Sequence, residues 1–204
     1  MIKTFKYCLP DIHLFNNESN QFLIWTPNKT YIVLGASNQP EDSLHIENVK
    51  NDKITVLKRP SGGQTVVLTP NNLIISAVFF DHKSSQPLEV FRKINNLVIL
   101  GLEDLGIKDL NLKGISDIAI KDKKIAGSAI YRNKNGLLYH AVLNLGESSA
   151  TFEKYLKHPS KEPDYREGRP HSEFVTSLRE NGCLHSFKHI KNTLSLSLNA
   201  SFDS

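Results

Sequence analysis

The sequence predicts an α+β fold with a mixed, mostly antiparallel sheet flanked by helices. Short apolar runs rich in β-branched and aromatic residues come first, and one long amphipathic stretch follows them. Further strand-like runs joined by short polar breaks come after that stretch. Strands grouped around a single long helix are typical of α+β proteins, whereas a doubly wound fold would alternate strands and helices.

The expected strands are bounded by Pro, Asn and Gly residues, which favour turns. They lie at residues 22–25, 31–35, 54–58, 65–68, 73–80, 115–120, 124–132 and 137–145. The run at 73–80 is almost continuously apolar, which predicts a strand buried on both faces. The polar breaks at 121–123 and 133–136 suit hairpin turns, so the last three strands should form a meander.

The clearest helix is predicted over residues 88–105. Its apolar residues recur at spacings of three and four: Leu88, Phe91, Ile94, Leu97, Val98, Leu102 and Leu105. Gly106 follows, where a helix end favours a left-handed residue. After residue 145 the chain becomes polar. We expect an irregular arm over residues 158–175, a short helix near 172–181, and a strand or disordered tail over 192–204.

Composition narrows the class of protein. The chain has 204 residues, which suits one domain, and a formal net charge of +4 from 25 basic and 21 acidic residues. No basic block interleaved with aromatic residues is present, which argues against nucleic-acid binding. Cys8 and Cys183 stand alone, without metal-ligand spacing. No signal peptide or bilayer-spanning run is seen, so we expect a cytoplasmic protein without a membrane partner.

The stretch "VLKRPSGGQTVVL" at residues 56–68 places two cations and two adjacent glycines between two strands. Glycines let backbone N–H groups converge on an anion, and the Arg59 guanidinium suits phosphate or carboxylate. The alternative is a hairpin with surface cations. Neither a Walker motif nor a GxGxxG motif is present, so this is not a common nucleotide loop.

A second candidate element is "KDKKIAGSAIYR" at residues 121–132. Gly127, Ser128 and Ala129 are unusually small for a strand interior, which suggests the close approach of a ligand. Lys124 stands beside them and can bind a carboxylate or polarise an acyl phosphate. The alternative is a hairpin lysine in solvent.

Two further elements are ambiguous by themselves. His140 lies inside the apolar run "LLYHAVLNL", where the alternative is a core histidine with one hydrogen bond. Arg166, Arg169 and His171 either face an anion from the arm or are solvated charges.

Together, "KRPSGGQTVVLTPNNLIIS", "ISDIAIKDKKIAGSAIYR" and "GLLYHAVLNL" resemble the lipoate–protein ligase family in content and order. The catalytic domain of that family is shared with biotin ligases. The resemblance covers about residues 25–145 and implies a class II synthetase-like, biotin–lipoate ligase-like catalytic domain over residues 1–150. Residues 151–204 are then expected to be part of the same domain, with no accessory domain.

The resemblance also implies an activity. Members of the family activate lipoate with ATP and Mg²⁺ to an acyl-adenylate. They then pass the acyl group to a lysine of an acceptor domain in a 2-oxoacid dehydrogenase complex or of the glycine-cleavage H protein. The chain is therefore expected to be a lipoate–protein ligase or lipoyltransferase, with lipoate or octanoate as substrate and a tunnel for the acyl chain.

Residues are carried over by position. Lys124 matches the catalytic lysine that holds the acyl carbonyl and the phosphate. The residues that match substrate and adenylate contacts are Arg59, Ser61, Gly62, Gly63, Gln64, Asn72, Asp117, Gly127, Ser128, Ala129 and His140. No metal-binding residue is implied.

The chain departs from the family pattern in three places. Gln64 replaces the third glycine of the turn, as in the octanoyltransferase branch, Leu68 replaces a histidine, and Asn71 replaces a glycine. The thiols of the cysteine-dependent branches are missing, which disfavours a thioester mechanism. The Gly-Arg-Gly-Arg loop of biotin ligases is also missing. The alternatives are a transferase that needs a preformed donor and a catalytically silent acyl-binding relative.

Overall fold

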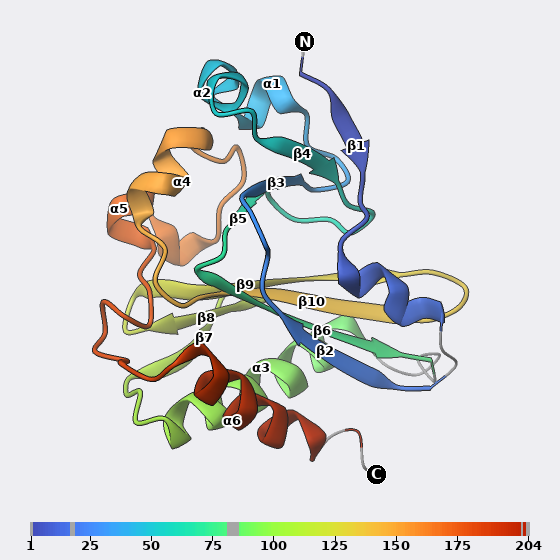
Figure 1. Ribbon diagram of the computed structural model, residues 1–204. Helices are drawn as coiled ribbons and strands as arrows, with labels where there is room; N and C mark the ends of the chain where they lie inside the picture. The colour runs from blue at the N-terminus through green and yellow to red at the C-terminus, as the bar shows by residue number, and fades with distance from the viewer. Residues whose placement is uncertain (1, 17–18, 81–85, 201, 203–204) are drawn as a thin grey trace.

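A six-stranded antiparallel sheet forms the centre of the computed structural model, which describes residues 2–16, 19–80, 86–200 and 202 (Figure 1). The strand order is β2 (Gln21–Trp25), β6 (Asn72–Phe79), β10 (Leu137–Asn144), β9 (Lys123–Arg132), β8 (Asp117–Ile120) and β7 (Leu110–Lys113). The predicted meander is confirmed as β8, β9 and β10. Strand β6 is buried along nearly its whole length, as its continuous apolar run predicts.

A second, smaller sheet lies above the first in Figure 1, with the order β1 (Thr4–Lys6), β4 (Thr55–Lys58), β3 (Tyr31–Leu34) and β5 (Val66–Leu68). Strands β1 and β3 run parallel to β4, whereas β5 is antiparallel to β3. The α+β, mixed-sheet prediction is therefore confirmed, with the strands divided between two sheets.

The Ser-Gly-Gly segment does not close a hairpin. Strands β4 and β5, which flank it, pair with opposite sides of β3 and are not neighbours in the sheet. The segment therefore crosses the end of β3, and the hairpin alternative is wrong.

Helices α3 (Pro87–Asp104) and α6 (Phe187–Asn199) cover one face of the six-stranded sheet (Figure 1). Gln86 and Glu89 form a capping box at the start of α3. The predicted apolar face is buried at Ile94 and Leu102, both 0% exposed. Gly106 has a φ of +80°, so the predicted left-handed residue after the helix is confirmed.

The shorter elements surround the smaller sheet and the rim of the larger one. They are η1 (Pro10–Asn16), α1 (Pro40–Ser43), α2 (Ile46–Asn51), α4 (Ser149–Tyr155), η2 (Asp164–Arg166) and α5 (His171–Phe174). The helix predicted near 172–181 is only the four-residue α5. Beyond it, Glu180 accepts hydrogen bonds from the Thr176 hydroxyl and the Ser177 backbone, which favours a turn.

The prediction of a strand or disordered tail over 192–204 is wrong for residues 192–199, which belong to α6. Residues 201, 203 and 204 lie outside the described residues. Alternating Leu and Ser suggests a strand, but Leu194 and Leu198 are buried while Leu196 is 73% exposed. That burial follows the spacing of four of a helix. The Ser195 and Ser197 hydroxyls donate to the Lys191 and Thr193 carbonyls, so helix formation leaves them partnered.

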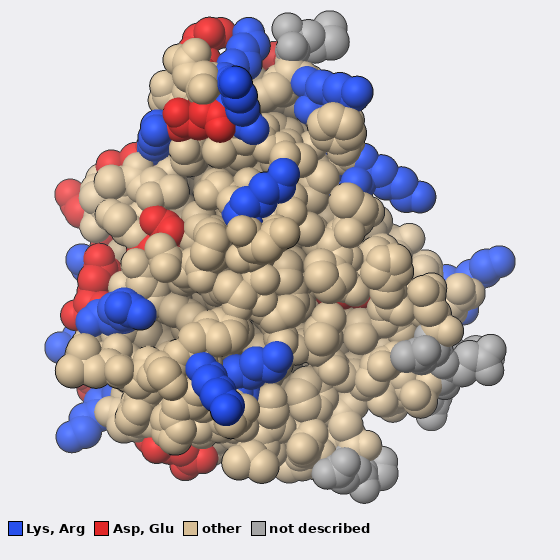
Figure 2. All heavy atoms as spheres, viewed as in Figure 1, with Lys and Arg blue, Asp and Glu red and all other residues tan. Residues whose placement is uncertain are grey.

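Basic side chains are scattered over the face shown in Figure 2 and form no continuous stripe there. None of the helices in the described part of the chain is long and apolar enough to span a bilayer.

The leucines of α6 provide a test of the helix. Leu194→Ala should lower the free energy of unfolding by about 2 to 5 kcal/mol, because it opens a cavity beside α3. Leu196→Ala, two residues away, should change it by less than about 0.5 kcal/mol. Urea denaturation of the two variants measures both effects. Equal losses would indicate that the leucines share one face, as in a strand.

Candidate functional site

A cavity of about 1150 Å³ opens between the two sheets. Its apolar wall is made by residues of β3, β5, β6 and β10, namely Val33, Val66, Val67, Leu68, Ile74, Ala141 and Val142. Residues 159–166 of the arm close one side. Of the site residues predicted from the sequence, all but Ser61 and Gly62 line this cavity. The fold therefore brings together segments that are far apart in the chain.

The Arg59 guanidinium is buried and is used inside the protein. Its Nε donates to the Ser61 hydroxyl at 2.9 Å, and its Nη1 donates to the Val33 carbonyl at 3.1 Å. Nη2 donates to the carbonyls of Gly62 and Gln64, each at 2.8 Å. Burial lowers the pKa of Arg59 to about 10, which leaves it charged at neutral pH. Arg59 therefore holds the turn in shape before it meets any ligand.

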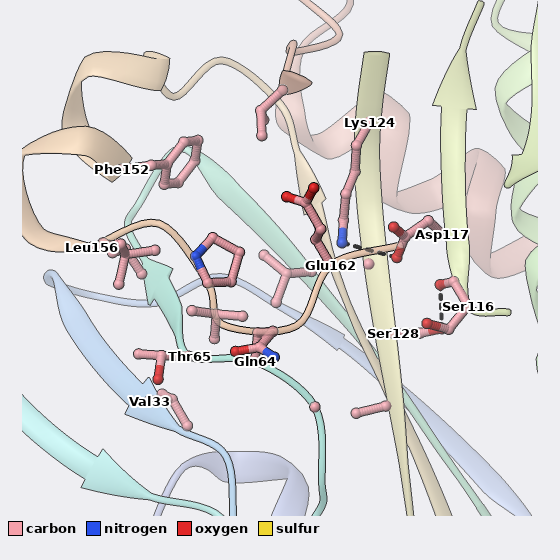
Figure 3. Close-up of a pocket in the computed structure, with 18 of the residues that line it drawn as sticks. Val33, Gln64, Thr65, Ser116, Asp117, Lys124, Ser128, Phe152, Leu156 and Glu162 are labelled. Atoms are coloured by element: carbon pink, nitrogen blue, oxygen red, sulfur yellow. Dashed lines mark hydrogen bonds and ion pairs between the residues drawn. The ribbon is translucent and has the colours of Figure 1, made fainter. Parts of the chain in front are cut away.

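The two glycines of the turn differ in their environment. Gly63 lines the cavity and has a φ of +86°, which side chains rarely adopt, whereas Gly62 lies behind the wall with open space around it. Gln64, which follows Gly63, also lines the cavity (Figure 3).

Lys124 and Asp117 form an ion pair at the cavity wall, with Nζ and Oδ1 2.8 Å apart (Figure 3). The other Asp117 oxygen accepts a hydrogen bond from the Tyr165 hydroxyl at 2.8 Å. Burial and the Asp117 carboxylate raise the pKa of Tyr165, so the phenol remains a donor. A Cβ on Gly127 would lie 2.6 Å from the Lys124 Cε and Nζ. Gly127 thus makes room for the lysine side chain, which is why a small residue is needed there.

Two of the other predicted residues hold the rim of the cavity. The Ser128 hydroxyl donates to the Ser116 carbonyl at 2.8 Å, which fixes the loop before β8 against β9 (Figure 3). The Asn72 side chain accepts from the Thr69 backbone N–H at 2.8 Å, so it stabilises the turn that precedes β6.

His140 is hydrogen-bonded at both ring nitrogens. Its Nε2 lies 2.7 Å from the Ser61 Oγ, and its Nδ1 lies 3.3 Å from the Asp11 Oδ2. Asp11 is fully buried and also accepts from the Tyr7 hydroxyl at 2.8 Å. The core alternative with a single hydrogen bond is wrong. Sequence reasoning missed Asp11 and Tyr7; the available signal was a carboxylate in the apolar stretch "YCLPDIHLF".

The arm carries buried charge, so the solvated alternative is wrong for Arg166. Its guanidinium lies 4.8 Å from the centre of the Phe174 ring, and Arg166 as a whole is 4% exposed. The Nε lies 3.3 Å from the Glu162 Oε2, whereas Nη2 has no hydrogen-bond partner among the described residues. Burial and nearby Arg166 lower the pKa of His171 to about 4. Arg166, Glu162 and His171 all line the cavity, whereas Arg169 does not.

Residues 8–198 match the model of the lipoyl protein ligase A/B catalytic domain. The chain belongs to this family. Inactive lipoate–protein ligase 2 of Plasmodium falciparum is 26% identical over 198 residues, which cover 81% of this chain and 51% of that protein. Lipoate-protein ligase A of Psychrobacter cryohalolentis is 28% identical and covers 72% of this chain and 41% of that protein. The chain thus spans about half of the length of these relatives, or less.

Solved structures agree with the lipoyl protein ligase fold. A bipartite lipoate protein ligase from Thermoplasma acidophilum has a TM-score of 0.81 at 20% identity, covering 95% of this chain and 76% of that one. A lipoate-protein ligase A bound with ATP has a TM-score of 0.79, also at 20% identity, covering 95% of this chain and 78% of that one.

The departures from the family pattern have distinct surroundings in this lipoyl protein ligase domain. Leu68 is 3% exposed and lines the cavity, so it makes the wall apolar where the family pattern has a histidine. Asn71 points away to Glu147, with its Nδ2 3.1 Å from Oε2. Leu68 and Gln64 are therefore the departures that alter the cavity itself.

The depressed pKa of His171 predicts a pH dependence of stability. Between the ordinary value of 6.5 and about 4, the unfolded chain binds a proton that the folded chain excludes. The free energy of unfolding should therefore fall as the pH is lowered through this window, and His171→Gln should reduce the slope. Urea denaturation at several pH values measures this. An unchanged slope in the variant would contradict the assignment.

Proposed function

We propose that this chain transfers a lipoyl or octanoyl group from an acyl-adenylate to a lysine of an acceptor domain. The observation that carries the proposal is the Lys124–Asp117 pair, in a cavity that an apolar wall and the buried Arg166 also line, in a chain of this family. An amphipathic donor, with an apolar acyl chain and an anionic phosphate, matches such a cavity.

The apolar wall suits the acyl chain. Val33, Leu68 and Ile74 are 1%, 3% and 2% exposed and line the cavity from different strands of the two sheets. Burial of methylene groups there provides affinity and fixes the acyl carbon relative to Lys124. The leucine in place of the family's histidine lengthens this apolar surface.

Lys124 suits the reacting carbonyl. An ammonium has three N–H donors, and the pair with Asp117 occupies one of them. The remaining donors can stabilise negative charge on the acyl oxygen and phosphate as the acceptor amine attacks. Asp117 and Gly127 hold the ammonium in place, the first by attraction and the second by leaving space.

Arg166 suits the phosphate. Its Nη2 is buried without a hydrogen-bond partner among the described residues, and the residue lines the cavity. A guanidinium edge of this kind pairs well with phosphate oxygens. Arg59, whose donors are largely used by the turn, contributes mainly through the shape of that turn.

ATP and Mg²⁺ are required only if the chain makes its own acyl-adenylate. Within the described ranges, no three His, Cys, Asp or Glu side chains gather to hold a metal ion. Mg²⁺ would then arrive on the nucleotide's phosphates, as it commonly does in phosphate chemistry. The acceptors that fit the family are lipoyl domains of 2-oxoacid dehydrogenase complexes and the glycine-cleavage H protein.

A second candidate is a catalytically silent protein that binds the acyl group or the acceptor. It is favoured by Gln64 and Leu68 in the cavity and by a relative whose name describes it as inactive. The two candidates share the cavity and differ only in turnover.

One experiment separates these possibilities. An apo acceptor domain is incubated with the chain and either lipoate with Mg-ATP or synthetic lipoyl-adenylate, and its intact mass is measured. A lipoyl mass gain in both mixtures means a self-sufficient ligase, and a gain only with the adenylate means a transferase. No gain with a competent acceptor would overturn the proposal, and lipoate binding by calorimetry would then support the silent protein.

Lys124→Ala should lower the rate of transfer by at least about 100-fold, because it removes the donors nearest the reacting carbonyl. Lys123→Ala is the matched control, since Lys123 is exposed and points to the other face of β9. Single-turnover transfer from lipoyl-adenylate measures both. Similar rates for Lys124→Ala and the control would rule Lys124 out of the chemistry.

Gly127→Ala should reduce the rate of transfer without a matching loss of stability. The added Cβ displaces the flexible end of Lys124, so the rate of transfer should fall by about tenfold. The free energy of unfolding should change by less than about 1 kcal/mol, because alanine suits a strand better than glycine. Transfer kinetics and urea denaturation are compared on one preparation. A loss of stability that matches the loss of transfer would contradict the spacing argument.

A further inference from the structure

Asp11 is a carboxylate buried behind the cavity wall, on an element that the sequence did not predict. It is 0% exposed, and its oxygens are hydrogen-bonded to Tyr7 at 2.8 Å, Ser76 at 3.2 Å and the His140 Nδ1 at 3.3 Å. Burial raises the pKa of Tyr7, with the Asp11 charge as the next cause, so this phenol stays protonated and donates. Three donors thus converge on one carboxylate, which is far from water.

With a neutral His140, the hydrogen bonds along this chain of contacts have one consistent set of directions. A carboxylate can only accept, so the His140 Nδ1 carries the proton that faces Asp11. The Nε2 of that imidazole is then an acceptor, and the Ser61 hydroxyl donates to it over 2.7 Å. The Arg59 Nε can only donate, so the Ser61 oxygen accepts from it. Asp11 therefore selects the tautomer of His140, and that tautomer selects the direction of the Ser61 hydroxyl.

The order serine, histidine, aspartate is also the order of a hydrolase triad. Three facts oppose a nucleophilic role for Ser61. It is 1% exposed, it does not line the cavity, and its oxygen already accepts from Arg59. An acyl donor in the cavity has no approach to that oxygen. The chain of contacts is therefore suited to holding the turn, not to attack.

We propose that Asp11 is a positioning residue for acyl transfer. It fixes the Nδ1–H tautomer of His140, and through Ser61 and Arg59 it preorganises the turn that presents Gly63 and Gln64 to the donor. The expected effect of Asp11 on acyl transfer rests on the proposed function, whereas its effect on the His140 tautomer does not. The link joins η1 near the N-terminus to β10 and to the turn after β4.

The first test is spectroscopic and needs no activity. A long-range ¹H–¹⁵N correlation spectrum of the labelled full chain at neutral pH reports which ring nitrogen of each histidine carries hydrogen. The His140 signals are assigned by their loss in His140→Gln. A protonated Nδ1 and an unprotonated Nε2 are expected. A protonated Nε2, alone or together with Nδ1, would overturn the proposal even if the chain transfers nothing.

Three variants test the effect on transfer. Asp11→Ala removes the acceptor, so the Nε2–H form of His140 should appear and the KM for lipoyl-adenylate should rise by about tenfold. Asp11→Asn keeps the size of the side chain but replaces one acceptor oxygen with an N–H donor, so it should also favour the Nε2–H form and raise the KM. Ser76→Ala removes a different hydrogen bond to Asp11 and is the control for general disturbance.

The outcomes are distinct. A raised KM in Asp11→Ala and Asp11→Asn but not in Ser76→Ala, together with the tautomer change, supports the positioning role. An equal rise in Asp11→Ala and Ser76→Ala would mean loss of packing and would overturn it. If Asp11→Ala does not fold, the wild-type spectrum and Asp11→Asn still decide, because a protonated Nε2 in the wild type or an unchanged His140 tautomer in Asp11→Asn would contradict the proposal.

Discussion

The hydrogen bonds of the buried Arg59 guanidinium are the contacts on which the site depends. They tie the turn after β4 to the carbonyl of Val33 in β3, and through Ser61 and His140 to the six-stranded sheet. The two sheets are therefore joined by oriented polar contacts at the place where the cavity lies. A charge without access to water is costly unless it is fully hydrogen-bonded. The cost of burying Arg59 thus favours the one conformation of the turn in which its N–H groups are hydrogen-bonded over conformations that leave them without partners.

A second constraint is the shared position of Lys124 and the arm. Lys124 is partly desolvated and forms an ion pair with Asp117, which also accepts a hydrogen bond from Tyr165 of the arm. The position of the arm and the position of the lysine are linked through one carboxylate. Arg166 lies on the same arm, so Lys124 and Arg166, two of the cations that line the cavity, are positioned by a common group of contacts. Such an arrangement favours a donor whose charge lies close to its reacting carbonyl.

Local patterns were enough to predict most strands and helix α3, whereas most of the residues placed at the cavity were carried over from the family resemblance. The spacing of apolar residues, the turn residues and the helix-ending Gly106 are signals contained in short stretches of sequence. Lys124 and the Ser-Gly-Gly turn could be singled out by the chemistry of their side chains and backbone. Helix α6 was missed because Leu-Ser alternation imitates a strand and only packing against α3 distinguishes the two. Asp11 was missed, and the sequence left open whether Arg166 is solvated, because the burial of both depends on partners elsewhere in the fold. The smaller sheet is built on the parallel pairing of β4 with β3 and with β1, which no local signal records.

The contact between His140 and Asp11 joins residues 129 positions apart in the chain. Contacts of this separation form late in folding, because a long loop must close before they contribute. Strand β1 has three residues, and all of them are exposed. Strand β1 can therefore fray at a lower free energy than global unfolding requires, whereas release of His140 requires the buried Tyr7, Leu9 and Asp11 to leave the core. Hydrogen exchange in η1 would then report the loss of the His140–Asp11 contact separately from the fraying of β1.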